Sequence, residues 1–158
     1  MSIRKIKTEL KKHSQSELID LVHDLYKKIP QVETYLNAAY TNDYDKIIEE
    51  KRKKIERFIY PSGREMKIKD KEARNLIKEI NRLEIPEITC ELEFYYVEYA
   101  TEVLRDFGHV NDSFLQSIYS AFQNGIENIN KINAHNEYNK RIQKIITNAS
   151  DHDIYLDY

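Results

Sequence analysis

The stretch that decides the fold is residues 86–108, PEITCELEFYYVEYATEVLRDFG. Pro86 suits the first turn of a helix, where a backbone N–H lacks a partner anyway, and Gly108 is predicted as a left-handed cap after the last turn. At 100° per residue, the large apolar side chains cover about 200° of the circumference. A face that wide contacts neighbours on more than one side, so residues 86–107 are predicted as the central helix.

The following helix, predicted at about 113–133, has a narrower apolar face of about 120°, with Ser, Gln, Asn, Glu and Lys opposite. This pattern is typical of an outer helix. Gly125 lies in the apolar face, where its missing side chain would let a neighbouring backbone approach closely. Where the apolar faces of the two long helices overlap, the sequence predicts a core that comprises Leu92, Tyr96, Val103, Ile118, Phe122 and Ile129.

Helical periodicity and capping signals continue through the rest of the chain. Ser14 followed three positions later by Glu17 predicts a capping box, and Pro30 ends the helix that the box opens. Asn42 or Asp43 is predicted to cap a helix that runs to about residue 60. The remaining predicted helices are residues 2–12, a helix from residue 30, and residues 70–83 and 135–149.

The chain is therefore predicted to be all-α, with about eight helices in a multi-helix antiparallel bundle or an irregular helical superhelix. Only 3 Gly and 3 Pro occur, too few for the turns of a sheet protein. Any strand is expected within residues 60–70, which hold the Pro and Gly breaks. The length predicts a single domain, residues 1–158, whose tail at residues 151–158 either docks or frays.

Charge is unevenly distributed along the chain. Residues 1–83 form a basic half with a balance of +6, and residues 84–158 form an acidic half with a balance of −8. Such asymmetry can mark a surface for nucleic acid or an acidic partner. The interpretation we favour is that the two halves pack against each other, or that two copies associate head to tail.

Composition excludes several classes of protein. Apolar runs of a few residues fall far short of the ~20 that span a bilayer, so no membrane association is predicted. No apolar segment follows the basic N-terminus, which argues against a secretory signal. The single cysteine, Cys90, is predicted to be a small buried hydrophobe, and a lone thiol fits a reducing cytoplasm.

Acidic residues form a stripe along the predicted central helix. Glu84, Glu87, Glu91, Glu98, Glu102 and Asp106 fall within about 100° of arc, with Tyr95 in the middle. Carboxylates at this spacing can hold a hard cation, but no histidine supplies the second half of a two-metal site. We therefore predict no metal and no cofactor, and carboxylates that are exposed or paired with Lys or Arg. The candidate surface comprises Glu91, Tyr95, Glu98 and Glu102.

A second candidate surface is a basic patch that comprises Lys51, Arg52, Lys53, Lys54, Arg64 and Lys67. If these residues converged, they would form a phosphate-binding surface. The sequence has no zinc-finger, RNP or glycine-clamp motif to accompany it. It also has no phosphate loop, nucleophile elbow or dinucleotide fingerprint, so no catalytic residue is predicted.

Short motifs along most of the chain carry a resemblance. They are Lys5 with Leu10, Glu17-Leu18, Asp24-Leu25-Tyr26, FIYPSGR at 58–64, YYVE at 95–98, and Phe107-Gly108. In this order they resemble a family of small bacterial proteins classed only as a domain of unknown function. The resemblance implies a helical bacterial cytosolic protein and brings no activity or site residues with it.

Together these patterns favour a non-enzymatic helical protein-interaction or scaffold protein. Its partner would be another protein or a second copy in a homodimer. One alternative is a nucleic-acid-associated accessory protein that uses the basic N-terminal half. Another is a carboxylate-based metal protein or enzyme that uses the acidic stripe.

Overall fold

The computed structural model describes residues 2–41, 44–61, 67–108 and 110–158. The all-α prediction is confirmed: 81% of the described residues are helical, in eight helices with no strand among them. The chain divides into two compact units, residues 1–43 and 44–158. The predicted charge boundary after residue 83 therefore falls inside the second unit, and the single domain stays a prediction.

The unit of residues 1–43 holds α1 (Ile3–Leu10), α2 (Gln15–Lys28) and α3 (Pro30–Thr41). The capping box at the start of α2 is confirmed. The Ser14 hydroxyl accepts from the Glu17 backbone N–H at 3.3 Å, and the Glu17 carboxylate accepts from the Ser14 N–H at 2.6 Å. Because two backbone donors are satisfied this way, the start of α2 is fixed locally.

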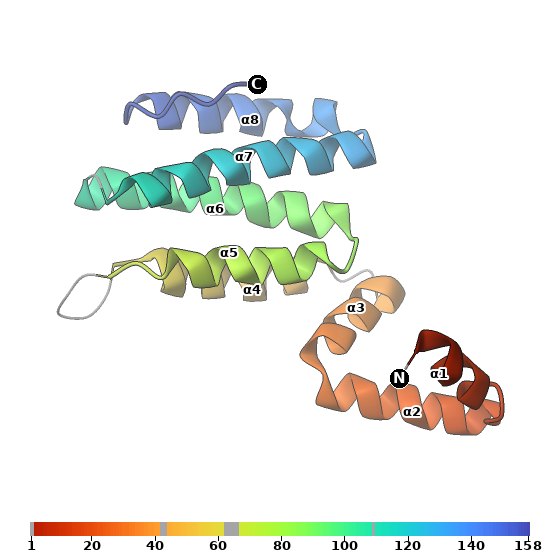
Figure 1. Cartoon of the computed structure of the whole chain (residues 1–158). Coiled ribbons are helices and arrows are strands. Elements are labelled where there is room, and N and C mark those ends of the chain that lie inside the picture. Colours follow the sequence, from red (N-terminus) through yellow and green to blue (C-terminus); the bar gives the residue numbers. More distant parts are fainter. Residues whose placement is uncertain (1, 42–43, 62–66, 109) are drawn as a thin grey trace. The chain divides into compact units, whose positions relative to one another are not determined.

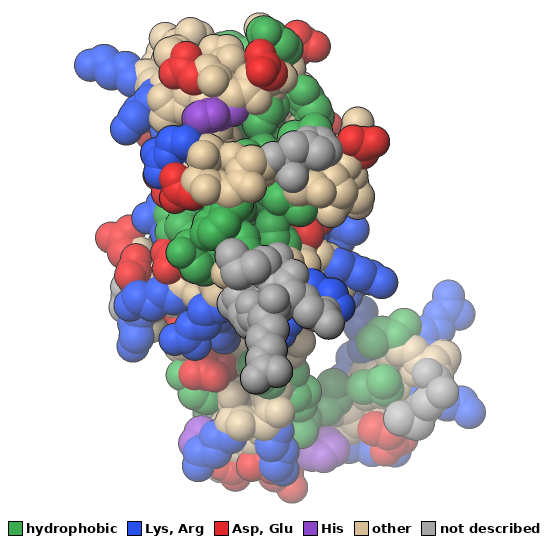
Figure 2. Space-filling view, turned by 90° about the vertical axis from the view of Figure 1, so that its left-hand side faces the viewer, with side chains coloured by type: hydrophobic (Ala, Val, Ile, Leu, Met, Phe, Trp, Pro, Cys, Tyr) green, Lys and Arg blue, Asp and Glu red, His purple; other side chains and the backbone are tan. Residues whose placement is uncertain are grey.

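The apolar side of α2 is only partly covered: α2 contacts α3, and Leu18 is half-buried. We call Leu18, Leu21, Val22, Leu25 and Ile29 the α2 stripe. Neither α1 nor α2 contains a buried residue, and among the described residues of this unit only Ala38 of α3 is buried. Val22 is 46% exposed and Leu21 39%, and apolar side chains are visible on the surface of this unit (Figure 2).

The unit of residues 44–158 is an antiparallel bundle of α4 (Tyr44–Ile59), α5 (Asp70–Asn81), α6 (Pro86–Phe107), α7 (Asp112–Ile132) and α8 (His135–Ser150). Successive helices reverse direction and lie in layers (Figure 1). Helix α6 contacts α4, α5, α7 and α8, as its wide apolar face predicts. Of the two predicted arrangements, an antiparallel bundle and an irregular superhelix, this unit forms the bundle.

The predicted core is confirmed. All six of its residues are at most 1% exposed, and they are Leu92, Tyr96, Val103, Ile118, Phe122 and Ile129. The prediction for Gly125 was wrong about the neighbour. An aromatic ring approaches rather than a backbone, because a Cβ added at Gly125 would lie 2.7 Å from Cε1 of Phe94.

Helix ends follow their sequence signals in part. Asn111 caps α7 by accepting from the Phe114 N–H at 2.9 Å. Gly108 ends α6 with φ 78° and ψ −167°. Its φ is positive, as predicted, but its ψ lies outside the left-handed helical region, so the prediction of a left-handed helical cap was wrong. The predicted caps Asn42 or Asp43, and residues 62–66 of the region where a strand was allowed, lie outside the described residues.

The C-terminal tail docks on the second unit. Ile154 is 2% exposed and Leu156 is 7% exposed. The Ile154 N–H donates to the Ala149 carbonyl at 3.0 Å, and Nε2 of Gln123 donates to the Asp157 carbonyl at 3.1 Å. Of the two outcomes expected for residues 151–158, docking is the one observed.

Truncating the core should be costly. Phe122→Ala removes a fully buried ring between α6 and α7 and should lower the free energy of unfolding by about 3–5 kcal/mol, because transfer and cavity terms add. Denaturant titration followed by circular dichroism measures this loss. A loss under about 1 kcal/mol would mean that the site collapses without a cavity.

Filling the position of Gly125 should also destabilise the fold. Gly125→Ala raises helix propensity by ~1 kcal/mol, but its methyl group meets the buried ring of Phe94, and overpacking costs about 1–3 kcal/mol. We expect a net loss in thermal melting. Ser120→Ala, at an exposed position of the same helix, should leave the melting temperature unchanged or raise it. Equal effects of the two variants would show that the Phe94 ring moves aside freely.

Candidate functional site

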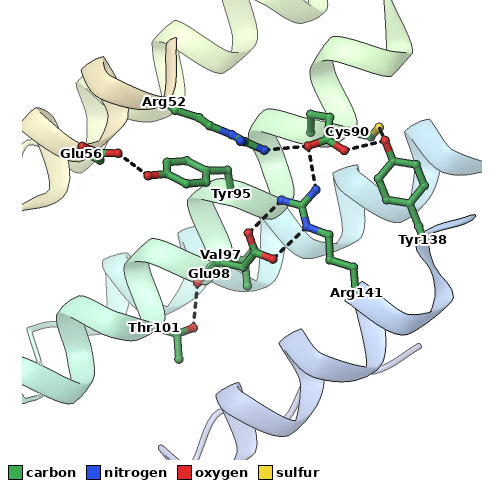
Figure 3. A network of polar contacts seen from close by, with 10 residues as sticks. Arg52, Glu56, Cys90, Tyr95, Val97, Glu98, Thr101, Tyr138 and Arg141 are labelled. Atoms are coloured by element: carbon green, nitrogen blue, oxygen red, sulfur yellow. Dashed lines mark hydrogen bonds and ion pairs between the residues drawn. The ribbon is translucent and has the colours of Figure 1, made fainter. Parts of the chain in front are cut away.

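The acidic stripe of α6 is joined to arginines from two other helices (Figure 3). Arg52 of α4 and Arg141 of α8 both donate to Oε2 of Glu91 at 2.8 Å. Arg141 also forks onto Glu98, with Nε to Oε1 at 2.9 Å and Nη2 to Oε2 at 2.8 Å. We call these four residues the arginine bridge. Because two-point arginine–carboxylate pairs fix direction as well as distance, the bridge sets how α4 and α8 lie against α6.

Tyrosines surround the bridge. The Tyr138 hydroxyl donates to Oε1 of Glu91 at 2.7 Å, and Sγ of Cys90 lies 3.5 Å from that hydroxyl. On the other side, the Tyr95 hydroxyl donates to the Glu56 carboxylate, and the guanidinium of Arg52 lies 4.8 Å from the centre of the Tyr95 ring. These contacts pair most of the donors and acceptors around the bridge (Figure 3), whereas Nε of Arg52 is buried without a hydrogen-bond partner.

The pKa shifts in this cluster are those expected of paired structural residues rather than of catalytic groups. Burial works against the charged form of Glu91, but Arg141 and the Tyr138 hydrogen bond outweigh it, so the pKa of Glu91 is lowered. Burial raises the pKa of the Cys90 thiol to about 11. Cys90 is therefore a neutral thiol near pH 7, and a nucleophile needs the thiolate.

A groove of about 560 Å³ lies beside the bridge. Its lining is acidic and partly aromatic: Tyr44, Asp45, Ile48, Glu49, Arg52, Glu87, Glu91 and Tyr138. Among the described residues, no group of three or more His, Cys, Asp or Glu side chains has the geometry of a metal site. Chemically, the groove suits a cationic group better than an anionic one, since its carboxylates outnumber its single arginine.

The candidate surface from the sequence is only partly open. Glu91 and Glu98 are held by arginines, as the prediction of paired carboxylates required, and Tyr95 is partly buried. Glu102 is exposed and is not part of the bridge. The proposal that Glu91, Tyr95, Glu98 and Glu102 form a functional surface stays a prediction.

The described residues of the basic patch point in different directions. Lys51 is 9% exposed, and Arg52 belongs to the arginine bridge. Lys53 and Lys54 are exposed but pair with Glu49 and Glu50 at 3.2 and 2.7 Å. Lys67 is exposed, and Arg64 lies outside the described residues. Figure 2 likewise shows basic and acidic side chains interspersed on the face that it presents.

A buried ion pair was missed by the sequence analysis. Glu93 of α6, 3% exposed, accepts from Arg74 of α5, 7% exposed, and from Nδ2 of Asn124 at 3.2 Å. Burial raises the pKa of Glu93, with Arg74 opposing the rise. A signal was present for Glu93, because it interrupts the apolar face of its helix, and a charge there needs a buried partner.

A polar groove of about 540 Å³ lies over this ion pair, between α5 and α7. Polar and charged side chains line it: Asp70, Lys71, Arg74, Asn75, Lys78, Ser113, Gln116, Ser117, Ser120 and Asn124. Its deepest groups bond within the protein, since Asp70 accepts from the Tyr96 and Ser117 hydroxyls while Arg74 and Asn124 hold Glu93. Each of these deep groups therefore already has a hydrogen-bond partner within the protein.

Fold and site define an all-α protein whose polar clusters are internally paired. The model of a family of unknown function (DUF6155) matches residues 1–155, so the chain belongs to that family. The family resemblance predicted from the short motifs is thereby confirmed. No curated protein and no solved structure matches the chain. None of its described helices has the length and apolar character needed to cross a membrane.

The arginine bridge should show in the pH dependence of stability. Arg141→Met should lower the free energy of unfolding by about 1–3 kcal/mol at neutral pH, because hydrogen bonds to charged groups are lost. Since the bridge lowers the pKa of Glu91, its contribution is present above the unfolded pKa and is lost as pH falls through the folded pKa. The difference between parent and variant in thermal melts should therefore shrink below about pH 4.

The matched control is Lys144→Met on the same helix, at an exposed position. It should match the parent at every pH. If the cost of Arg141→Met were the same in acid as at neutral pH, packing of the arginine stem rather than its charge would account for the loss.

Proposed function

We propose that the chain is a non-enzymatic protein-interaction protein that binds an amphipathic helix of a protein partner through the α2 stripe. One observation carries the proposal: a regular apolar stripe runs along α2, yet α2 has no buried residue. Leu21, Val22 and Leu25 are each at least 36% exposed. Contiguous exposed apolar surface of this kind typically marks an interaction site.

The free energy of burying apolar surface favours a state in which a partner covers this stripe. Burial of apolar surface contributes roughly 25 cal/mol per Å², and very small helical units usually need an added partner to gain enough of it. Among the described residues of the unit 1–43, Ala38 alone is buried. A partner that covers the stripe would supply the burial that this unit lacks.

The spacing of the stripe favours a helix as the occupant. Leu18, Val22, Leu25 and Ile29 alternate by four, three and four residues. This is the spacing of a coiled-coil seam, in which each side chain fits between side chains of a facing helix; the first three residues lie within α2, and Ile29 is its C-cap. A flat apolar sheet or a single aromatic anchor would not need that repeat.

The polar clusters favour this proposal over the two alternatives. Glu91 and Glu98, which the metal-protein alternative would use, pair with Arg52 and Arg141, and Cys90 is a buried, protonated thiol. The cations expected to bind nucleic acid include buried Lys51 and the bridging Arg52. We further propose a bacterial cytosolic location, on the family resemblance and on the single reduced thiol.

Co-purification from cells tests the proposal. The tagged parent should recover a protein partner, of any identity including a second copy, in a fixed ratio. Leu25→Asp places a charge in the stripe and should abolish that recovery, because an unpaired charge is costly in an apolar contact. Ser16→Asp adds the same charge at an exposed position on the opposite side of α2 and should leave recovery intact.

Circular dichroism of the purified variants checks that both keep the helix content of the parent. If Leu25→Asp recovered the same partner in the same ratio as the parent, the stripe would not be the contact and the proposal would fail.

A further inference from the structure

We infer that the helix which covers the α2 stripe is α2 of a second copy, packed antiparallel across a two-fold axis. This inference rests on the proposed function and names the partner of that same surface. A two-fold interface uses one patch twice, so the patch has to be complementary to itself. The α2 stripe meets that requirement in its spacing and in its charges.

The spacing is symmetric about the middle of the stripe. In an antiparallel pair, Val22 of one copy faces Leu25 of the other, and Leu18 faces Ile29. Each layer of the seam then holds two aliphatic side chains of similar size. Because no layer holds a polar residue, the seam closes without a buried unpaired group.

The charges of α2 select the antiparallel direction. On one flank of the stripe, the acidic residues Glu17 and Asp24 come before the basic residue Lys28 at the end of the helix. Antiparallel pairing sets the acidic part of one helix beside the basic end of the other, and it also aligns the helix dipoles favourably. Parallel pairing would instead set this charged flank beside the uncharged flank of the other copy, which holds Ile19 and Tyr26.

The surface pairs within one copy do not oppose this arrangement. Lys28 donates to Asp24 at 2.8 Å, but the two side chains are 70% and 59% exposed. An exposed pair of this kind is worth ~1 kcal/mol or less, so Lys28 can exchange Asp24 for a carboxylate of the second copy at little cost. Glu17 and Asp24 lie on the same flank of the stripe as Lys28, within reach of such an exchange.

Sedimentation velocity of the full chain over a wide concentration range is the first test. The parent should be a dimer that dissociates on dilution. Leu25→Asp should be monomeric at concentrations where the parent and Ser16→Asp are dimeric. A parent that stays monomeric throughout, or a dimer that Leu25→Asp leaves unchanged, would overturn the inference.

Cross-linking with a short bis-maleimide tests the direction. Asp24→Cys and Lys28→Cys place thiols on the same flank, one turn apart, and leave the seam intact. In the antiparallel dimer the two copies of residue 24 are separated by about 1.5 Å along the axis, and those of residue 28 by about 14 Å. We expect cross-linked dimer from Asp24→Cys and almost none from Lys28→Cys. Cys90 does not interfere, because it is fully buried.

Cross-linking of Lys28→Cys as strong as that of Asp24→Cys, or cross-linking of neither variant, would overturn the inference. The two proposals fail separately. If the parent is monomeric but Leu25→Asp still abolishes recovery of a different protein from cells, the inference fails and the proposed function stands. If Leu25→Asp affects neither association nor recovery, both fail.

Discussion

Helix α6 has to be covered on several sides at once, and the second unit is organised around that requirement. Its neighbours α4, α5, α7 and α8 each take part of its surface. The tightest approach is that of α7, where the absence of a side chain at Gly125 admits the ring of Phe94. Packing at this density leaves few alternative registers, so the other polar contacts of the bundle follow from how these helices meet.

Several basic and acidic side chains form ion pairs inside the bundle instead of lying on separate faces. Arg52 and Arg74 come from the basic half of the sequence, and their partners Glu91 and Glu93 come from the acidic half. The favoured interpretation of the charge asymmetry, that the halves pack against each other, agrees with these pairs. Ion pairs that are partly or fully buried contribute specificity of register more than net stability, since desolvation offsets much of their attraction.

The unit of residues 1–43 has a different character. Its α2 is as regularly amphipathic as the bundle helices, yet its apolar side chains have the exposure of surface residues. A stripe of that kind is costly to leave in water, and this is why the proposed activity of the protein is association. The polar clusters of the bundle join its helices, and the proposed interaction surface is the apolar stripe that the described fold leaves exposed.

The sequence by itself determined the helices, the capping box at Ser14, and the six core residues. Those features depend on periodicity and on hydrogen bonds between neighbours in the chain, which local spacing encodes. It also limited Glu91 and Glu98 to two states, exposed to solvent or paired with Lys or Arg. Only the tertiary structure decided that Arg52 and Arg141 supply them, that Glu93 pairs with Arg74, and that a ring of Phe94 rather than a backbone meets Gly125. Partners from helices far apart in the sequence depend on how those helices are rotated and layered, and the spacing within one helix carries no record of that.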